Sequence, residues 1–400
     1  MTGKKHSKKF KITLSIILAS IAAGLIFVAI RMITAPTDLK IVQTYALPEF
    51  PNIETMVPQT TTEKLAIAID GQPAYDNTKE TQPTASTAKI LTALMVIEKQ
   101  PINPGETGPS IEITQEFYNR YAYYIAHNGS NTPVAIGEQI SEYDALASML
   151  LPSSNNMADT LAIWAFGSLD AYKSAAEAKL KEWGLTQTTI GIDASGFSDT
   201  TTSSASDLAL LGQKLMNNPT LAEIVGTKTK TVPVAGEIKN TNQLLGESSI
   251  IGVKTGFIGD PSGYCLVSAY QQNDHTITTT VLNSPTRDAS FATTKTLTDA
   301  LQQNLTETTV AKKDQELGYY ESWWNGKTPI TSDNDINILT WSSATHDAKL
   351  IMPDAPDTQT PTGTLTITNG TATTDYPIHA DNLQPEPSFL DRLKYALFLK

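Results

Sequence analysis

A run of nineteen residues without a charge, Ile12 to Ile30, lies near the start of the chain and is closed by Arg31. As a helix it spans about 28 Å, close to the roughly 30 Å hydrocarbon core of a bilayer. The lysines that precede it are Lys4, Lys5, Lys8, Lys9 and Lys11. This excess predicts a cytoplasmic N-terminus and an exported body. Cleavable signals usually have apolar regions of only about 7–15 residues, so we expect an uncleaved anchor, with a signal peptide cut near Ala35 as the alternative.

Composition and pattern divide the rest of the chain. The expected segments are a basic cytoplasmic segment at 1–11, a transmembrane signal-anchor at 12–33, a Pro/Thr-rich stalk at 34–61, a main domain at 62–304, a small β domain at 305–387 and an amphipathic tail at 388–400. The stalk is predicted because each proline removes a backbone donor and favours extended geometry before it. For the tail, two placements stay open: on a membrane surface, or packed on the β domain.

The main domain has strand-like patterns at both ends and helical patterns between them. Helices are expected at 86–98, 141–151, 155–166, 170–183, 206–216 and 291–304. Strands are expected from Leu65 and at 227–235, 250–256, 263–270 and 276–282. Helical periodicity flanked by alternating, β-branched segments predicts an α/β (α+β) domain with a helical insertion.

Charge and cysteine content exclude several classes of function. The net charge is −12, and an acidic body repels nucleic-acid phosphates, so we expect no nucleic-acid partner. The one cysteine, Cys265, excludes an intrachain disulfide and is expected as a buried strand residue. The five histidines form no metal-ligand pattern, so we expect neither a metal nor a cofactor.

Ser86 and Lys89 form a Ser-x-x-Lys pair at the start of the apolar helix. Spacing of three places both side chains on one helical face. A serine hydroxyl needs a base to take its proton, and a lysine serves only when neutral. Neutrality near pH 7 requires lowering the lysine pKa by roughly 3 units, which burial and a nearby positive charge both favour. Alone, the pair equally fits a helix cap and a solvated lysine.

Two further polar motifs follow in the chain. Ser153 and Asn155 form a Ser-x-Asn turn between two apolar helical segments, where an ordinary loop and cap is the alternative. Lys254, Thr255 and Gly256 end an apolar strand, where an edge lysine that deters aggregation is the alternative. A glycine there lets a substrate backbone approach closely.

Together and in this order, the three motifs resemble those of the penicillin-recognising serine enzymes. The flanking residues are similar to those of the low-molecular-mass D-alanyl-D-alanine carboxypeptidases. These residues are Thr84 to Leu94, Gly252 to Gly256 with Ser262-Gly263-Tyr264, Asp207 to Leu211 and Asn240 to Leu245. The resemblance covers about 62–304 and extends weakly into the β domain and tail. It implies a transpeptidase/β-lactamase-like fold with a central, mostly antiparallel sheet, followed by a small all-β domain.

The resemblance also implies roles for the motif residues. Ser86 would be the nucleophile, Lys89 its general base and Ser153 a proton relay. Asn155 would hold the peptide backbone, and Lys254 would keep the site positive. Thr255, with Gly256 beside it, would meet the terminal carboxylate. The backbone N–H groups of Ser86 and Phe257 would form the oxyanion hole.

The implied function is removal of the terminal D-alanine from peptidoglycan stem peptides, with β-lactams as inhibitors. The expected location is the bacterial cell membrane, crossed once, with the catalytic domain outside the cytoplasm. The protein would act on the cell wall and so influence cell shape. A DD-endopeptidase and a non-catalytic wall- or penicillin-binding protein are the alternatives. A class A β-lactamase is disfavoured because no Glu-x-x-Leu-Asn supplies its deacylating base.

Two features depart from the family pattern. Many relatives have an arginine directly before the phenylalanine of the last domain helix, whereas here Ser290 precedes Phe291 and Arg287 lies three residues earlier. The stretch 101–140, around Tyr121 to Tyr124, matches no family pattern, and we expect its His127 to be a surface residue.

Overall fold

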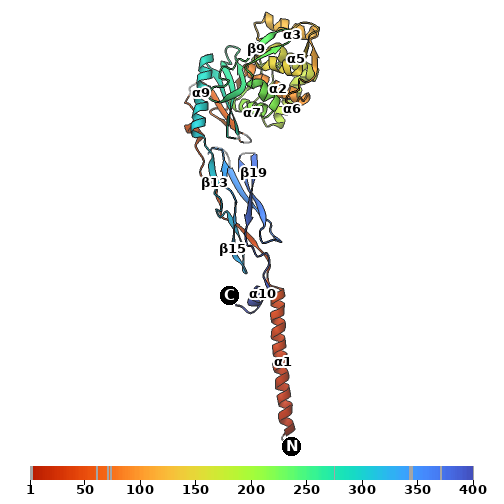
Figure 1. Ribbon diagram of the computed structural model, residues 1–400, viewed down its shortest axis with the longest axis vertical. Helices are drawn as coiled ribbons and strands as arrows, with labels where there is room; N and C mark the ends of the chain where they lie inside the picture. The colour runs from red at the N-terminus through yellow and green to blue at the C-terminus, as the bar shows by residue number, and fades with distance from the viewer. Residues whose placement is uncertain are drawn as a thin grey trace.

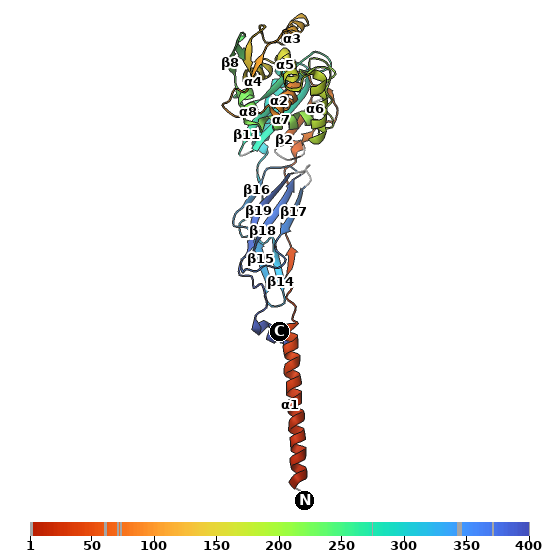
Figure 2. The ribbon, with the colours of Figure 1, turned by 90° about the vertical axis from the view of Figure 1, so that its right-hand side faces the viewer.

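The structure, a computed structural model, describes residues 3–59, 62–69, 72, 74–273, 275–341, 346–369 and 372–399. It is elongated, with the long N-terminal helix at one end, a β-rich part in the middle and a helix-rich body at the other end (Figure 1). The same three parts lie along one axis in the perpendicular view (Figure 2).

A five-stranded sheet in the order β10-β11-β12-β2-β3 forms the centre of the helix-rich body. Its strands are β2 (Lys64–Ile69), β3 (Tyr75–Asp76), β10 (Ile250–Gly256), β11 (Tyr264–Gln272) and β12 (His275–Ser284). All four pairings are antiparallel. β2, from the start of the domain, pairs with β12 from its end, so the helices between them are an insertion. The expected antiparallel sheet with a helical insertion is confirmed.

Helices cover both faces of this sheet, because β2 alternates its side chains between two cores. Leu65, Ile67 and Ile69 pack with Leu297 and Leu301 of α9 (Arg287–Asn304). Ala66 and Ala68 belong to the opposite core, which includes the leucines of α7 (Ala205–Met216). From Leu65 to Ile69, β2 is therefore apolar, as a strand covered on both faces must be.

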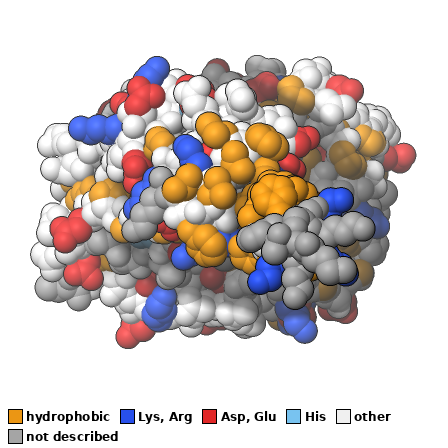
Figure 3. Space-filling view, turned by 90° about the horizontal axis from the view of Figure 1, so that it is seen from below, with side chains coloured by type: hydrophobic (Ala, Val, Ile, Leu, Met, Phe, Trp, Pro, Cys, Tyr) orange, Lys and Arg blue, Asp and Glu red, His pale blue; other side chains and the backbone are white. Residues whose placement is uncertain are grey.

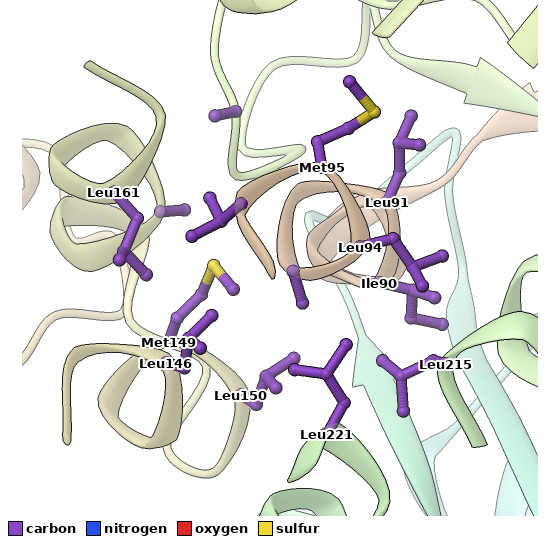
Figure 4. Close-up of a cluster of buried hydrophobic side chains, with 14 of the residues drawn as sticks. Ile90, Leu91, Leu94, Met95, Leu146, Met149, Leu150, Leu161, Leu215 and Leu221 are labelled. Carbon is purple, nitrogen blue, oxygen red and sulfur yellow. The ribbon is translucent and has the colours of Figure 1, made fainter. Parts of the chain in front are cut away.

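The inserted helices pack around α2 (Lys89–Lys99), which is buried over most of its length. Its neighbours include α4 (Glu142–Leu150), α5 (Asn155–Phe166) and α7, and α8 (Pro219–Gly226) packs against α4 and α7. Ile90, Leu91, Leu94 and Met95 lie among leucines and methionines of these helices (Figure 4). Burying each such side chain stabilises the fold by about 1.5–3 kcal/mol, so this core holds the start of α2 in place.

The body contains further helices and three short strand pairs. They are η1 (Ile53–Thr55), η2 (Ala85–Ala88), α3 (Gln115–Ala126), α6 (Leu169–Glu182), and the strand pairs β4 (Gln82–Pro83) with β7 (Thr202–Ser203), β5 (Ser110–Glu112) with β6 (Gln139–Ser141), and β8 (Thr229–Val232) with β9 (Gly236–Lys239).

Several expected helix starts differ from the structure, most of all that of the last domain helix, expected at 291, which begins at Arg287. The helix expected from Ser86 begins as the 3-10 turn η2 and becomes α-helical only at Lys89. The helix expected from Ser206 begins at Ala205, because the cap is Ser204, whose hydroxyl accepts from the N–H of Asp207.

The middle of the molecule is a six-stranded sheet in the order β1-β14-β15-β19-β18-β17, with β13 and β16 paired beside it. These strands are β1 (Lys40–Gln43), β13 (Thr308–Ala311), β14 (Gly318–Ser322), β15 (Gly326–Thr331), β16 (Ile336–Ile338), β17 (His346–Ile351), β18 (Thr362–Asn369) and β19 (Ala372–Ala380). Its apolar residues form a separate core. The small all-β part expected after the main domain is present.

Parts of the stretch 34–61, expected as a Pro/Thr-rich stalk, contribute to the core of the six-stranded sheet and to the core between β2 and α9. β1 pairs with β14, and Tyr45 is buried among the residues of the six-stranded sheet. Ile53 of η1 is fully buried beside β2 and α9. The prolines predicted an extended chain, but the apolar residues between them pair with a strand edge and pack into the two cores.

The segment Lys8–Ile33 of α1 (Gly3–Ile33) is long and apolar enough to cross a membrane. Among the described residues it is the one helix of which this is true. α10 (Phe389–Ala396) packs against the end of α1, where the Arg31 guanidinium lies 3.7 Å from the ring centre of Phe398 and 4.7 Å from that of Tyr395. Phe389 and Leu390 stay exposed. In the view from the N-terminal end of the molecule, hydrophobic side chains gather near the centre, with Lys and Arg side chains beside them (Figure 3).

Candidate active site

Ser86 lies in η2 at the entrance to α2, and the turn before it is unusual. Ala85 has a φ of 48°, in the left-handed region that a residue with a Cβ rarely adopts. Lys89 begins α2 one turn later, and its Nζ lies 2.8 Å from Ser86 Oγ. Ser86 is 8% exposed and Lys89 is fully buried. The serine therefore opens to the surface while its lysine partner sits behind it.

The Lys89 amine has three oxygen neighbours. Besides Ser86 Oγ, its Nζ donates to Asn155 Oδ1 at 2.7 Å and to the carbonyl of Ser195 at 2.9 Å. Burial lowers the pKa of Lys89 to about 7, although the carboxylates of Asp193 and Asp159 act in the opposite direction. Near neutral pH a large share of Lys89 is therefore the neutral amine that a general base requires.

Ser153 and Asn155 come from the turn between α4 and α5. Ser154 caps α5, and its hydroxyl accepts from the N–H of Met157. Ser153 has a φ of 68° and lines the cleft in front of Ser86. Within the described residues, no hydrogen bond joins the Ser153 hydroxyl to Ser86 or Lys89. The structure thus brings both predicted residues to the site, with only Asn155 bonded to Lys89.

The end of β10 forms the opposite wall. Thr255 and Gly256 line the cleft, and Thr255 Oγ1 lies 2.6 Å from Thr241 Oγ1. A Cβ at Gly256 would lie 3.0 Å from the backbone nitrogen of Ser86, so the strand approaches the nucleophile turn closely. Lys254 is 1% exposed; burial, and then the charge of Lys89, hold its pKa well below the usual value.

The cleft between these walls has a volume of about 260 Å³. Its lining residues are Ser86, Asn128, Ser130, Ser153, Thr241, Thr255, Gly256, Phe257, Tyr264, Cys265, Arg287, Ser290 and Phe291. The Phe257 ring stacks on that of Tyr264 with centroids 4.0 Å apart. Phe257 and Tyr264 therefore give the cleft an aromatic side, whereas the side chains nearer to Ser86 carry hydroxyls and amides.

Arg287 lies in the cleft lining, as Ser290 does. Ser290 stands at the position where many relatives have an arginine. Its Oγ donates to the carbonyl of Arg287 at 2.7 Å, so this hydroxyl already has a hydrogen-bond partner. Arg287 is the first residue of α9, capped by Thr286, so the start of this helix carries a positive side chain to the cleft.

The stretch 101–140, which matched no family pattern in the sequence, also reaches the site, and the sequence did not predict this contact. Asn128 and Ser130, just after α3, line the cleft, and the carbonyl of Ser130 accepts from the N–H of Asn155. His127 is exposed as expected, with Nδ1 2.8 Å from the carbonyl of Tyr123. The Asn128-Gly129 pair was a local turn signal, but it carried no information about which loop would meet Asn155.

Other expectations concern Cys265 and metal ions. Cys265 is buried in β11, as expected, at one edge of the cleft. Among the residues that the structure describes, no group of three or more His, Cys, Asp or Glu side chains is arranged to hold a metal ion.

Comparison with known proteins shows which sequences this chain resembles. A sequence model of peptidase S11, described as D-alanyl-D-alanine carboxypeptidase, matches residues 55–286. A D-alanyl-D-alanine carboxypeptidase of Streptomyces sp. (strain K15) is 28% identical over 232 residues, which cover 54% of this chain and 77% of that protein. A D-alanyl-D-alanine endopeptidase of Pseudomonas aeruginosa is 30% identical over 219 residues, covering 52% of this chain and 66% of that protein.

Solved structures show the same fold. The Streptomyces K15 DD-transpeptidase superposes with a TM-score of 0.54 at 23% identity, covering 61% of this chain and 98% of that one. A peptidoglycan synthesis regulatory factor (PBP3) from Streptococcus pneumoniae superposes with a TM-score of 0.63 at 19% identity, covering 82% of this chain and all of that one. The second match extends beyond the helix-rich body.

Proposed function

This chain belongs to the peptidase S11 family of D-alanyl-D-alanine carboxypeptidases, and from that premise we propose that it removes the terminal D-alanine from peptidoglycan stem peptides through an acyl-enzyme on Ser86. The observation that carries the proposal is the fully buried Lys89 amine 2.8 Å from Ser86 Oγ. A site that only binds needs no nucleophile paired with a neutral base.

The proposed reaction has two steps. In the first, Ser86 Oγ bonds to the carbonyl carbon of the penultimate D-alanine while Lys89 takes the hydroxyl proton. The C–N bond then breaks, and the amine of the leaving D-alanine receives that proton through Ser153. In the second step, water attacks the ester and gives a proton to Lys89, which passes it to the Oγ of Ser86 as the ester bond breaks. The backbone N–H groups of Ser86 and Phe257 would hold the oxyanion in both steps.

Substrate binding is proposed from the walls of the cleft. Asn155 holds the peptide backbone, and Thr255 meets the terminal carboxylate, with Gly256 leaving room for the peptide. Lys254, whose Nζ donates to the carbonyl of Thr255 at 2.9 Å, adds positive charge behind Thr255 when it is protonated. The proximity of Gly256 to the nitrogen of Ser86 supports this arrangement, because it brings the strand that binds substrate to the atom that reacts. β-Lactams would acylate Ser86 by the same route.

We further propose that α1 anchors the protein in the bacterial cell membrane, with removal as a signal peptide as the alternative. The catalytic domain, 62–304, would then face the cell wall outside the cytoplasm. The six-stranded sheet lies between α1 and that domain and would hold it away from the bilayer (Figure 1).

The test is D-alanine release from diacetyl-lysyl-D-alanyl-D-alanine by the wild type, by Ser86→Ala and by Ser174→Ala, whose serine is exposed on α6. We expect release by the wild type and by Ser174→Ala, and none by Ser86→Ala. Failure of the wild type both to release D-alanine and to be labelled by a fluorescent penicillin would contradict the proposal and favour a non-catalytic wall-binding protein.

A DD-endopeptidase is the second candidate, favoured by the similarity to the Pseudomonas aeruginosa endopeptidase. Its chemistry on Ser86 would be the same, with a cross-linked peptide in place of the leaving D-alanine. Digestion of purified cross-linked dimers separates the two: monomer formation without prior D-alanine release indicates the endopeptidase.

A further inference from the structure

A second buried polar cluster lies behind Lys89, in residues to which no role has been assigned above. Asp159 of α5 is 1% exposed. Its Oδ2 accepts from the Tyr124 hydroxyl at 2.8 Å, and its Oδ1 accepts from the N–H of Ala194 at 3.1 Å. Tyr124, on α3, is equally buried, and its ring meets that of Phe197 edge to face at 5.4 Å. Burying a carboxylate is costly, so this one is fully engaged.

This cluster connects to Lys89 through two successive residues, Ala194 and Ser195. The N–H of Ala194 is held by Asp159, and its carbonyl accepts from Thr92 at 2.6 Å. The next residue is Ser195, whose carbonyl accepts from Lys89 Nζ at 2.9 Å. Asp193 closes the turn by accepting from the N–H of Ser195 at 2.8 Å. The backbone that sets the direction of the Ser195 carbonyl is thus held by Asp159 at Ala194 and by Asp193 at Ser195 and Phe197.

That direction matters for the chemistry of the amine. A neutral lysine has two N–H donors and one lone pair. Asn155 Oδ1 and the Ser195 carbonyl take the two N–H groups, at 2.7 and 2.9 Å. The lone pair is then left for the third neighbour, the hydroxyl of Ser86. Without the Ser195 carbonyl in place, the amine would be free to rotate and present an N–H to Ser86 instead.

We propose that Asp159, oriented by Tyr124, is a positioning residue that, together with Asp193, fixes the backbone at Ala194 and Ser195 and thereby aims the Lys89 lone pair at Ser86. This role rests on the proposed function, since it concerns the base of the same reaction. α3, from the stretch that sequence analysis left without a family pattern, thus contributes to catalysis through Tyr124.

The charge of Asp159 makes this role measurable. The charged and titratable groups that face it are Tyr124 and Arg120 of α3, the latter at 3.7 Å, Asp193, and Lys89, with Lys254 beyond Lys89. Burial, and then Asp193, raise the pKa of Asp159 to about 6, so it is mainly ionised where Lys89 titrates. Its negative charge raises the pKa of Lys89. Removing that charge should therefore let Lys89 lose its proton at lower pH.

The experiment measures the rate of acylation by a fluorescent penicillin between about pH 5 and pH 9, with the full-length protein in detergent. The variants are Asp159→Asn, Tyr124→Phe and, as a matched control, Asp207→Asn. Asp207 is also a buried carboxylate that accepts from a backbone N–H and a hydroxyl, but its partners are Gln187 and Thr188. Thermal unfolding of each variant reports the structural cost separately.

For Asp159→Asn we expect the acid limb to move to lower pH by about half a unit to one unit, and the plateau rate to fall about tenfold. Tyr124→Phe keeps the ring packing and should lower the plateau about threefold. Asp207→Asn should change the thermal midpoint alone. An unmoved limb in Asp159→Asn, or an equal shift in Asp207→Asn, would overturn the role while leaving the proposed function intact. Absence of acylation in the wild type would overturn both.

Discussion

Gly196 lies against the carbonyl oxygen of Ala85, the residue before the nucleophile: a Cβ built at Gly196 would come within 2.0 Å of that oxygen. Gly196 also has a φ of 71°, in the left-handed region. The turn that holds Lys89 and the turn that carries Ser86 therefore touch backbone to backbone. Neither can move independently, which couples the position of the base to that of the nucleophile.

Substituting Gly196→Ala should disrupt the site, because the methyl group must displace the Ala85 carbonyl. We expect acylation by penicillin to fall at least a hundredfold and the thermal midpoint to drop. Gly184→Ala is the matched control, since Gly184 has a similar φ of 73° but no atom within 4 Å of its Cβ position. It should lose only about 1 kcal/mol of stability. Equal effects of both substitutions would show that backbone strain, not contact with Ala85, is responsible.

The pH dependence of kcat/KM should show an acid limb governed by Lys89. Burial lowers its pKa to about 7, and only the neutral amine can take the proton of Ser86. Each pH unit below about 7 should therefore reduce kcat/KM close to tenfold. D-alanine release measured from pH 5 to pH 9 tests this. A rate that stays level down to pH 5 would contradict a lysine base.

Removing the buried amine should stabilise the fold while abolishing activity. Because the folded-state pKa of Lys89 is depressed, the unfolded chain binds more protons between about pH 7 and pH 10.5, and stability is lost as pH falls through that window. Lys89→Met should therefore raise the free energy of unfolding at pH 7 and reduce its rise with pH. Lys99→Met, at the exposed end of the same helix, should change neither. Urea unfolding at pH 7 and pH 9 distinguishes these outcomes.

Arg287 should contribute to recognition of the substrate carboxylate, because it carries positive charge to the cleft lining. Arg287→Ala should lower kcat/KM about tenfold, or about 1.4 kcal/mol, for a peptide with a free terminal carboxylate. The loss should be much smaller for the same peptide as its amide. Lys295→Ala, on the same helix but paired with Asp299 at 2.6 Å, is the control. Equal losses on acid and amide would contradict this role.

The length of the N-terminal truncation should matter for stability. A fragment of residues 36–400 keeps β1, which pairs with β14 and whose Gln43 bonds to Ala348 and Leu350 of β17. A fragment of residues 62–400 lacks that strand and the buried Tyr45 and Ile53. We expect the shorter fragment to lose about 3 kcal/mol or more of stability. Both should remain labelled by penicillin. Equal urea midpoints would indicate that β1 contributes little.

Much of the site could be predicted from the sequence because its signals are local. The spacing of Ser86 and Lys89, the turn at Ser153 and Asn155, and the strand ending in Gly256 each follow from short-range geometry. The long apolar helix and most helices of the body follow from composition and periodicity in the same way. Such patterns persist whatever the rest of the chain does.

The tertiary structure alone decided which distant segments complete the site. Ser195 meets Lys89 from 106 residues away, and Asp159 reaches the same turn from another helix. Residues Lys40–Gln43 of the expected stalk form strand β1 because they pair with the edge of β14. The pKa of Lys89 likewise depends on burial by residues from several segments. These features are properties of contacts between remote parts of the chain, and no local pattern encodes them.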